Sequence, residues 1–203
     1  MSPQPLPALR KRFGTQLRIA PYIGAFWLGL NTTRPPLKAN PQLREALSLA
    51  VDRNILTRHV TGFGETAAYG IVPPGLPGYG AAKIHWADWD QTQRDARAKA
   101  LYRAAGYSDA NPLTLELRYN TSTPHRRLAL AVASMWRDTL GVRVRLRNEE
   151  WKVFVGNRRQ KVITQVFRTL FEVGYPIRFL RLVDDFGADD DASMAAGTTA
   201  AFT

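Results

Sequence analysis

Two stretches of alternating apolar and polar residues flank a helical segment in the second half of the chain. Leucines and a tyrosine alternate with polar side chains in residues 113–119, and residues 142–146 show the same alternation, which is typical of half-buried strands. Residues 124–140 between them predict a helix that ends at Gly141. A strand, a helix and a strand in this order predict two parallel strands joined by a right-handed crossover.

Two more helices precede this unit. Asn40 is a good N-cap and Pro41 suits a first helical position, so we expect a helix over residues 41–60 that ends at Gly62. Its apolar residues share one face at helical spacing, namely Leu43, Ala46, Leu47, Ala50, Val51 and Ile55. Asp90 and Gln93 form a capping-box pattern for a second helix that runs to Gly106.

Shorter elements complete the pattern. Residues 17–30 predict an extended segment that ends before the Pro35-Pro36 breaker. A short helix over residues 151–159 and a third strand over residues 162–167 follow the parallel unit. The class predicted from this order is α/β.

The composition is ordinary apart from its charge. The chain has 203 residues, 45% of them hydrophobic and 22% charged, which favours a globular domain over a disordered one. There is no cysteine, which excludes disulfides and thiolate metal sites, and no apolar run reaches the length of a membrane span. The net charge of +11 leaves open a basic protein that associates with nucleic acid, with Arg143, Arg145 and Arg147 on one strand face as the contact strip.

Motifs of catalysis and metal binding are missing from the sequence. There is no nucleophile elbow, phosphate-binding loop or zinc-protease helix. His59, His85 and His125 are far apart and lack a metal-ligand spacing. A small hydrolase that uses His125 is a weaker alternative, since no base partner accompanies that histidine. We therefore expect neither an enzyme nor a cofactor.

Two runs of sequence carry a resemblance to a known family. Residues 26–75 read FWLGLNTTRPPLKANPQLREALSLAVDRNILTRHVTGFGETAAYGIVPPG, and residues 117–155 read LRYNTSTPHRRLALAVASMWRDTLGVRVRLRNEEWKVFV. In this order and at this spacing, they resemble the family 5 extracellular solute-binding proteins, and the oligopeptide-binding branch in particular. The resemblance implies a second lobe of the periplasmic-binding-protein-like type II fold, with a mixed sheet whose parallel βαβ unit is flanked by helices.

The resemblance also implies a function. Family members capture peptides in the periplasm and deliver them to the permease subunits of an ABC importer. The implied protein is a monomer that binds oligopeptides and has no specific affinity for nucleic acid. A receptor that accepts many peptide sequences must hold the backbone, the ammonium and the carboxylate that all peptides share. Because a buried charge without a partner is costly, the two charged ends of the peptide need oppositely charged residues.

Five residues match ligand-binding positions of the family. Trp151 stands where the family has a pocket-lining tryptophan, and His125 matches the histidine after its Y-N-T-S turn. Arg159 and Arg168 match arginines just before and at the end of the next strand. Phe171 stands where the family has a tryptophan, so an aromatic wall is still expected there. The position of the aspartate that binds the ligand ammonium is occupied by Gly174, so the resemblance implies that this anchor is absent.

The extent of the resemblance predicts the domain organisation. It covers residues 17–167, so we expect residues 1–16 to be an N-terminal remnant, 17–182 an incomplete peptide-binding lobe and 183–203 a disordered tail. Family members are much longer, and the chain is therefore expected to be a truncated fragment without the first lobe. The sequence contains no recognisable export signal, which predicts a cytoplasmic location for the chain as written.

Overall fold

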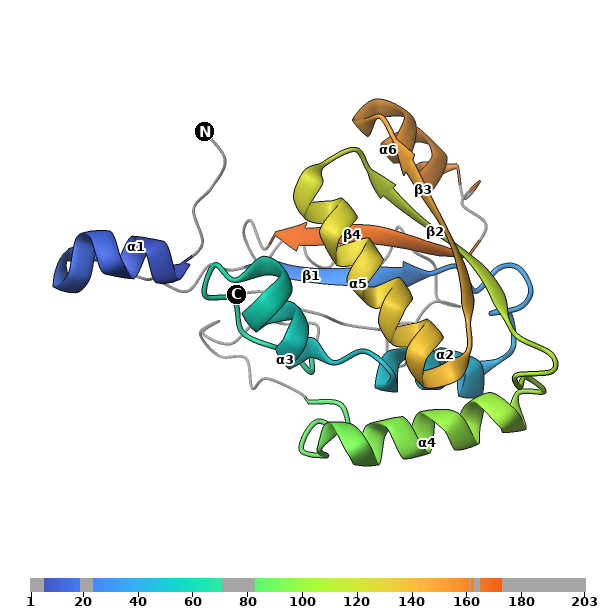
Figure 1. Ribbon diagram of the computed structural model, residues 1–203. Coiled ribbons are helices and arrows are strands. Elements are labelled where there is room, and N and C mark those ends of the chain that lie inside the picture. Colours follow the sequence, from blue (N-terminus) through green and yellow to red (C-terminus); the bar gives the residue numbers. More distant parts are fainter. Residues whose placement is uncertain (1–5, 19–23, 71–82, 161, 163–164, 173–203) are drawn as a thin grey trace.

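The core of the molecule is one mixed four-stranded sheet with helices packed against it (Figure 1). The computed structural model describes residues 6–18, 24–70, 83–160, 162 and 165–172. The strands lie in the order β1-β4-β2-β3, where β1 is Gly24–Leu30, β2 is Thr114–Asn120, β3 is Arg143–Glu149 and β4 is Val166–Glu172. Strand β2 is parallel to β3 and β4, whereas β1 runs antiparallel to β4. The α/β class and the mixed sheet are confirmed.

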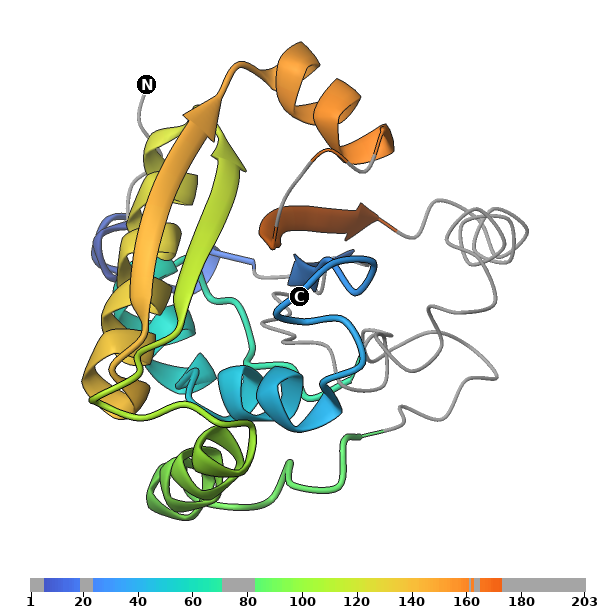
Figure 2. The same ribbon diagram turned by 90° about the vertical axis from the view of Figure 1, so that its right-hand side faces the viewer.

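The predicted parallel unit is present. Strands β2 and β3 pair with Leu117 opposite Leu146, and helix α5 (Thr123–Leu140) connects them. Gly141 ends the helix in the left-handed conformation at φ +71°, which only glycine adopts at little cost. Helix α5 packs on β2 and β3 from one side of the sheet (Figures 1 and 2).

The helix predicted over residues 41–60 is broken into three pieces. Helix α2 (Pro41–Leu49) is followed by a short turn α3 (Arg53–Ile55) and a π-helical turn η2 (Leu56–Thr61). The break occurs because the Asp52 carboxylate accepts a hydrogen bond from the Ile55 amide at 3.0 Å and starts a new helix. The predicted N-cap Asn40 and the stop at Gly62 are confirmed.

The break changes one face of this region. Leu43, Leu47 and Val51 are fully buried, as their spacing predicted. Ile55 was expected on the same face, but it is 46% exposed because the chain changes direction before it. Trp136 of α5 donates its indole N–H to the Leu47 carbonyl at 2.8 Å, which ties α5 to the end of α2.

Helix α4 (Gln91–Ala104) packs against α2 and begins with the predicted capping box. In that box the Asp90 carboxylate and the Gln93 amide each accept a backbone N–H of the other residue. The helix ends just before Gly106, which adopts φ +88°.

Two buried arginines fix the segment before α4. The guanidinium carbon of Arg53 lies 4.9 Å from the ring centre of Trp86, and that of Arg94 lies 4.6 Å from the ring centre of Tyr69. Arg53 also donates to the Ser48 and Val51 carbonyls at 3.0 and 3.1 Å. Its burial lowers the pKa of Arg53 to about 10. The stacked aromatic rings and carbonyl oxygens offset the cost of burying these charges.

The ends of the described chain differ from expectation. The third strand begins at Val166 rather than at residue 162, and Val162 is exposed. The extended segment begins as β1 at Gly24, and the predicted N-terminal remnant contains helix α1 (Leu6–Phe13) and the 3₁₀ turn η1 (Gly14–Gln16). Helix α1 buries none of its residues and touches the body where the Leu6 amide donates to the Gly62 carbonyl at 3.0 Å. The expected tail, residues 183–203, lies outside the described residues.

Candidate functional site

Trp151 is the first residue of helix α6 (Trp151–Arg159), which follows β3 directly. The Glu150 carboxylate caps the helix by accepting the Lys152 amide at 2.7 Å. Trp151 is 51% exposed and stacks on Phe154, with 6.4 Å between ring centres. Phe154 is fully buried, whereas the Trp151 ring beside it is open to solvent.

A buried ion-pair network holds α6 in place beside β2. The Glu149 carboxylate accepts hydrogen bonds at 3.1 Å from Arg118 of β2 and, also at 3.1 Å, from the Asn157 amide of α6. Arg118 also donates to Glu116, and Arg147 lies 3.6 Å from the Glu149 carboxylate. The alternation in β2 predicted Glu116 and Arg118 on a polar face, yet Arg118 is buried because the network covers it. Sequence reasoning missed this network.

Arg159 and its neighbour Arg158 end α6. Arg159, the predicted ligand residue, is exposed, whereas Arg158 is half-buried. Burial, together with the adjacent charge of Arg159, lowers the pKa of Arg158. A partly desolvated guanidinium interacts more strongly with an anion than a fully hydrated one. Arg158 is thus the less exposed cation of this pair, and sequence matching did not single it out.

His125 lies in the first turn of α5, half-buried against β1. Its ring centre is 6.2 Å from that of Phe26, and the two planes are tilted by 31°. Phe26 pairs with Leu170 of β4 in the β1–β4 ladder. The structure therefore brings His125 to the ladder that contains the remaining candidates.

Arg168 and Phe171 both belong to β4. Arg168 lies opposite Leu28 and Phe171 opposite Ala25 in the antiparallel register. Because β4 continues to Glu172, beyond the predicted end at residue 167, Arg168 falls inside the strand and not at its end. Gly174, the position that lacks the family's aspartate, lies outside the described residues.

The candidates thus form two groups. His125 is joined through Phe26 to the β1–β4 ladder, next to the register position of Phe171. Trp151 and Arg159 stand at opposite ends of α6, about 12 Å apart along its axis. Figure 2 shows α6 and β4 on the side of the molecule away from α5. That Trp151, Arg159, Arg168 and Phe171 line one concave surface stays a prediction.

The described part of the chain holds no cluster of three or more His, Asp or Glu side chains suited to a metal ion. No described helix has the length and apolarity needed to cross a membrane. On β3, Arg143, Arg145 and Arg147 are exposed as the alternation predicted, but Arg147 is engaged with Glu116 and Glu149.

Comparison with known proteins decides the family. The family model of bacterial extracellular solute-binding proteins, family 5, matches residues 1–192. The chain belongs to this family. The periplasmic oligopeptide-binding protein OppA of Salmonella typhimurium is 39% identical over 152 residues, which are 75% of this chain and 28% of that protein. The chain thus spans under a third of the length of this curated relative.

Solved structures of family 5 proteins have the same fold. The Escherichia coli murein tripeptide binding protein MppA superimposes with a TM-score of 0.79 at 28% identity, covering 97% of this chain and 45% of that one. Haemophilus influenzae OppA in complex with RPPGFSPFR gives a TM-score of 0.76 at 30% identity, covering 94% of this chain and 37% of that one. These are type II periplasmic binding proteins, which confirms the predicted fold.

Proposed function

We propose that this chain is the peptide-binding part of a family 5 receptor that supplies oligopeptides to an ABC importer. The observation that carries the proposal is the 39% identity to an oligopeptide-binding protein over three quarters of the chain. Membership in a family of solute-binding proteins also favours a non-enzymatic binding role. We propose that the receptor acts as a monomer. The relatives named as periplasmic favour the periplasm as the place where the receptor works.

The proposed contacts follow from the two groups of residues. Trp151 offers an exposed ring for ligand side chains, and the cations Arg158 and Arg159 offer charge to a peptide carboxylate. His125, Arg168 and Phe171 contribute from α5 and β4. Extended peptides are held by backbone hydrogen bonds, so few side chains are needed for affinity.

The test uses a chimera as well as the chain. Residues 17–182 replace the matching segment of the Salmonella relative, and calorimetry measures oligopeptide binding to the chimera and to the chain alone. We expect the chimera to bind and the chain alone to bind weakly, because the chain covers 28% of that relative. Failure of a folded chimera to bind any peptide would contradict the proposed function.

Two variants on one helix test the site within the chimera. Trp151→Ala should raise the Kd roughly ten-fold, which corresponds to about 1.4 kcal/mol, because it removes an aromatic contact. Val153 is 53% exposed on the same helix, so Val153→Ala is the matched control and should leave the Kd unchanged. Equal effects of the two substitutions would exclude Trp151 as a ligand contact.

The ammonium anchor has a separate test. Gly174→Asp in the chimera should strengthen binding of peptides with a free N-terminus more than binding of their acetylated forms. Acetylation removes the charge and leaves the rest of the peptide intact, so the difference isolates the ion pair. The same gain for both peptides, or a gain for neither, would mean that position 174 does not receive the ammonium.

A further inference from the structure

Strand β3 forms one margin of the sheet, since it pairs with β2 and has no described strand on its other side (Figure 2). The Arg143 N–H donates to the Leu113 carbonyl at 2.8 Å, so the odd-numbered residues of β3 turn their backbone toward β2. The backbone N–H and C=O groups that point the other way, unpaired among the described residues, belong to Val144, Leu146 and Asn148. We call this row of outward backbone groups the β3 edge.

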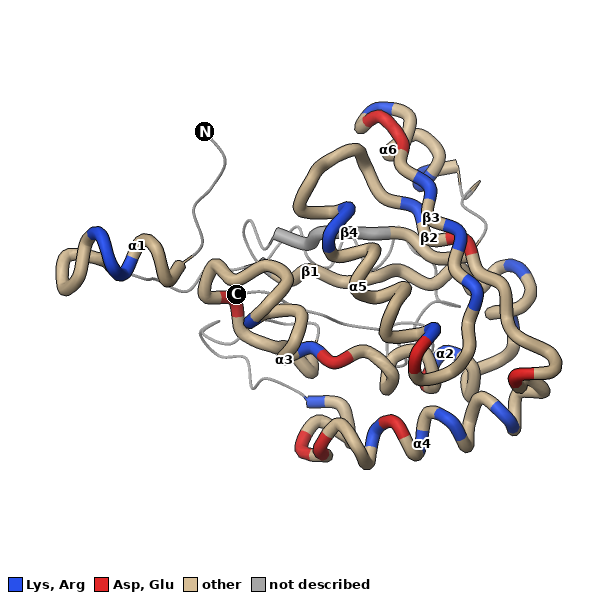
Figure 3. Tube along the Cα trace, in the orientation of Figure 1, with Lys and Arg blue, Asp and Glu red and all other residues tan. Residues whose placement is uncertain are grey.

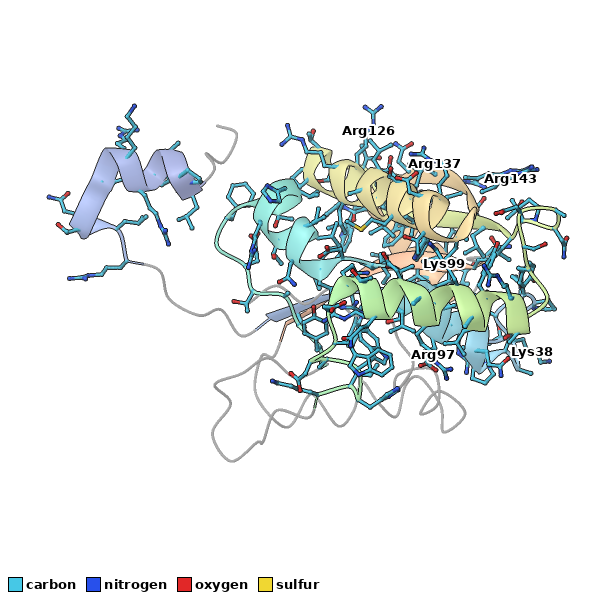
Figure 4. All side chains as sticks on the ribbon, turned by 60° about the horizontal axis from the view of Figure 1, so that its bottom comes forward. Lys38, Arg97, Lys99, Arg126, Arg137 and Arg143 are labelled. Carbon is cyan, nitrogen blue, oxygen red and sulfur yellow. The ribbon has the colours of Figure 1, made fainter. Side chains whose placement is uncertain are left out.

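One face of β3 is cationic. Arg143 and Arg145 are exposed on the face opposite α5 and have no ion-pair partner among the described residues. Arg147, the next residue of this row, is engaged with two glutamates. Figure 3 shows basic residues spaced along β3, and Figure 4 shows Arg143 beyond the end of α5. Two cations beside the β3 edge are therefore free to receive carboxylates.

The other face of β3 is apolar. Val144 and Leu146 are half-buried and pack against the core on the side of α5. Successive side chains of a strand point to opposite faces of its sheet. A strand added along the β3 edge would thus meet two cations on one face and two apolar side chains on the other.

We propose that the β3 edge binds an extended peptide segment in which acidic and apolar residues alternate. The segment adds a strand to the sheet through its backbone, as in other cases of β-augmentation. Its acidic side chains pair with Arg143 and Arg145, and its apolar side chains lie beside Val144 and Leu146. The free backbone groups, the cations and the apolar face are all used in this arrangement.

A second copy of the chain fits the β3 edge less well. In an antiparallel pair of two β3 strands, the arginines of one copy lie on the same face as those of the other, and like charges directly opposite each other are destabilising. Charged residues on an edge strand are a common protection against such self-association. A nucleic acid would use the arginines and leave the outward backbone groups and the apolar face without a partner.

The β3 edge is separate from the candidate peptide contacts on the β1–β4 ladder. In the strand order β1-β4-β2-β3, the strand β2 stands between that ladder and β3. The inference therefore goes beyond the peptide binding proposed above and does not depend on it. It assigns the chain a second peptide-binding surface, selective for side-chain pattern.

A nuclear magnetic resonance titration of the ¹⁵N-labelled full chain tests the inference. The probe is a six-residue peptide of alternating glutamate and valine, acetylated and amidated so that neither end is charged. We expect the largest shifts at the amides of Val144, Leu146 and Asn148, whose N–H groups gain an acceptor. The amides of Arg145 and Arg147 already face β2 and should shift less. Absence of shifts along β3 would overturn the inference.

Two control peptides separate strand addition from charge attraction. Three glutamates followed by three valines have the same composition without the alternation, and this peptide should bind several-fold more weakly. N-methylation of alternate residues in the probe removes backbone donors and should abolish binding. Equal affinity of all three peptides would show that only net charge matters and would overturn the inference.

A charge reversal tests the role of the two arginines. The double variant Arg143→Glu, Arg145→Glu should bind the glutamate–valine probe at least about ten-fold more weakly and should instead bind a lysine–valine peptide of the same pattern. The matched control, Arg97→Glu with Lys99→Glu, makes the same charge change at exposed positions of α4 and should alter the Kd less than about two-fold. Equal losses in the two double variants would contradict the assignment.

Two other occupants would each give a distinct result. Shifts of the β3 amides that grow with protein concentration in the absence of peptide would assign the edge to a second copy of the chain. Binding of duplex DNA that is tighter than binding of the probe, is lost in the Arg143→Glu, Arg145→Glu variant and leaves the Val144 amide unshifted would assign the arginines to nucleic acid. Either result would overturn the inference.

Discussion

Arg118 shows how a single side chain positions a functional helix. It is 6% exposed and reaches from β2 to the Glu149 carboxylate, which also holds Asn157 of α6. A buried ion pair of this kind adds little net stability, but removal of one partner leaves the other charge desolvated. The pair therefore determines where α6 and Trp151 lie.

Arg118→Ala should lower the free energy of unfolding by about 3 kcal/mol, since Glu149 would stay buried without its main cation. Urea denaturation followed by circular dichroism measures the change. Arg145→Ala is the control, because Arg145 is exposed on the neighbouring strand without an ion pair among the described residues, and its effect should stay within about 0.5 kcal/mol. Similar losses in both variants would show that the network does not support the fold.

The burial of Arg118 was beyond the reach of sequence reasoning. Alternation along β2 places Glu116 and Arg118 on one face and predicts that face to be polar. Whether a polar face meets water depends on what lies across it, here Glu149 and Asn157 from a later part of the chain. For the same reason, matching by sequence favoured Arg159, although the fold encloses Arg158 more.

At the scale of elements, α2 packs against α4 and is tied to α5 by a hydrogen bond. Leu47 is fully buried, and the Leu47 carbonyl accepts the Trp136 indole. Leu47→Ala should lower the free energy of unfolding by about 2–5 kcal/mol through lost burial and the cavity left behind. Thermal and urea unfolding of the purified chain give this value.

Ile55 provides the matched comparison for Leu47. Periodicity assigned both residues to one apolar face, but Ile55 is 46% exposed. Ile55→Ala should therefore cost less than about 1 kcal/mol. A cost as large as that of Leu47→Ala would mean that residues 41–60 form the single predicted helix after all.

Local signals explain which elements were predicted well. Asn40, Asp90 and Gly141 act on their own neighbours. The sequence therefore predicted to the residue where α2 and α4 begin and where α5 ends. Asp52 gives an equally local signal, an N-cap in the middle of an apolar pattern. The apolar periodicity concealed this signal, and the break after α2 was missed.

At the scale of the whole molecule, β4 joins the two ends of the described chain. It pairs antiparallel with β1 along its length and parallel with β2, so β1 is connected to the rest of the sheet only through β4 among the described strands. Residues 24–30 and 166–172 are far apart in sequence, and neither segment contains a signal for its partner. The order of the strands could therefore not be predicted, although the parallel pair could.

This arrangement makes the folding of the chain depend on its fourth strand. A chain ending at Gln160 lacks β4, which leaves β1 without a neighbour and exposes core residues that Val166, itself fully buried, packs with. Its melting temperature should fall by at least about 10 °C, or about 3–5 kcal/mol for a domain of this size. A chain ending at residue 182, the predicted end of the lobe, should melt within about 2 °C of the full chain if residues 183–203 add no core contacts. Differential scanning calorimetry of the three chains measures both shifts. A cooperative transition at the same temperature for the shortest chain would mean that β1 is held by other contacts, whereas early melting of the chain ending at residue 182 would extend the folded lobe beyond its predicted boundary.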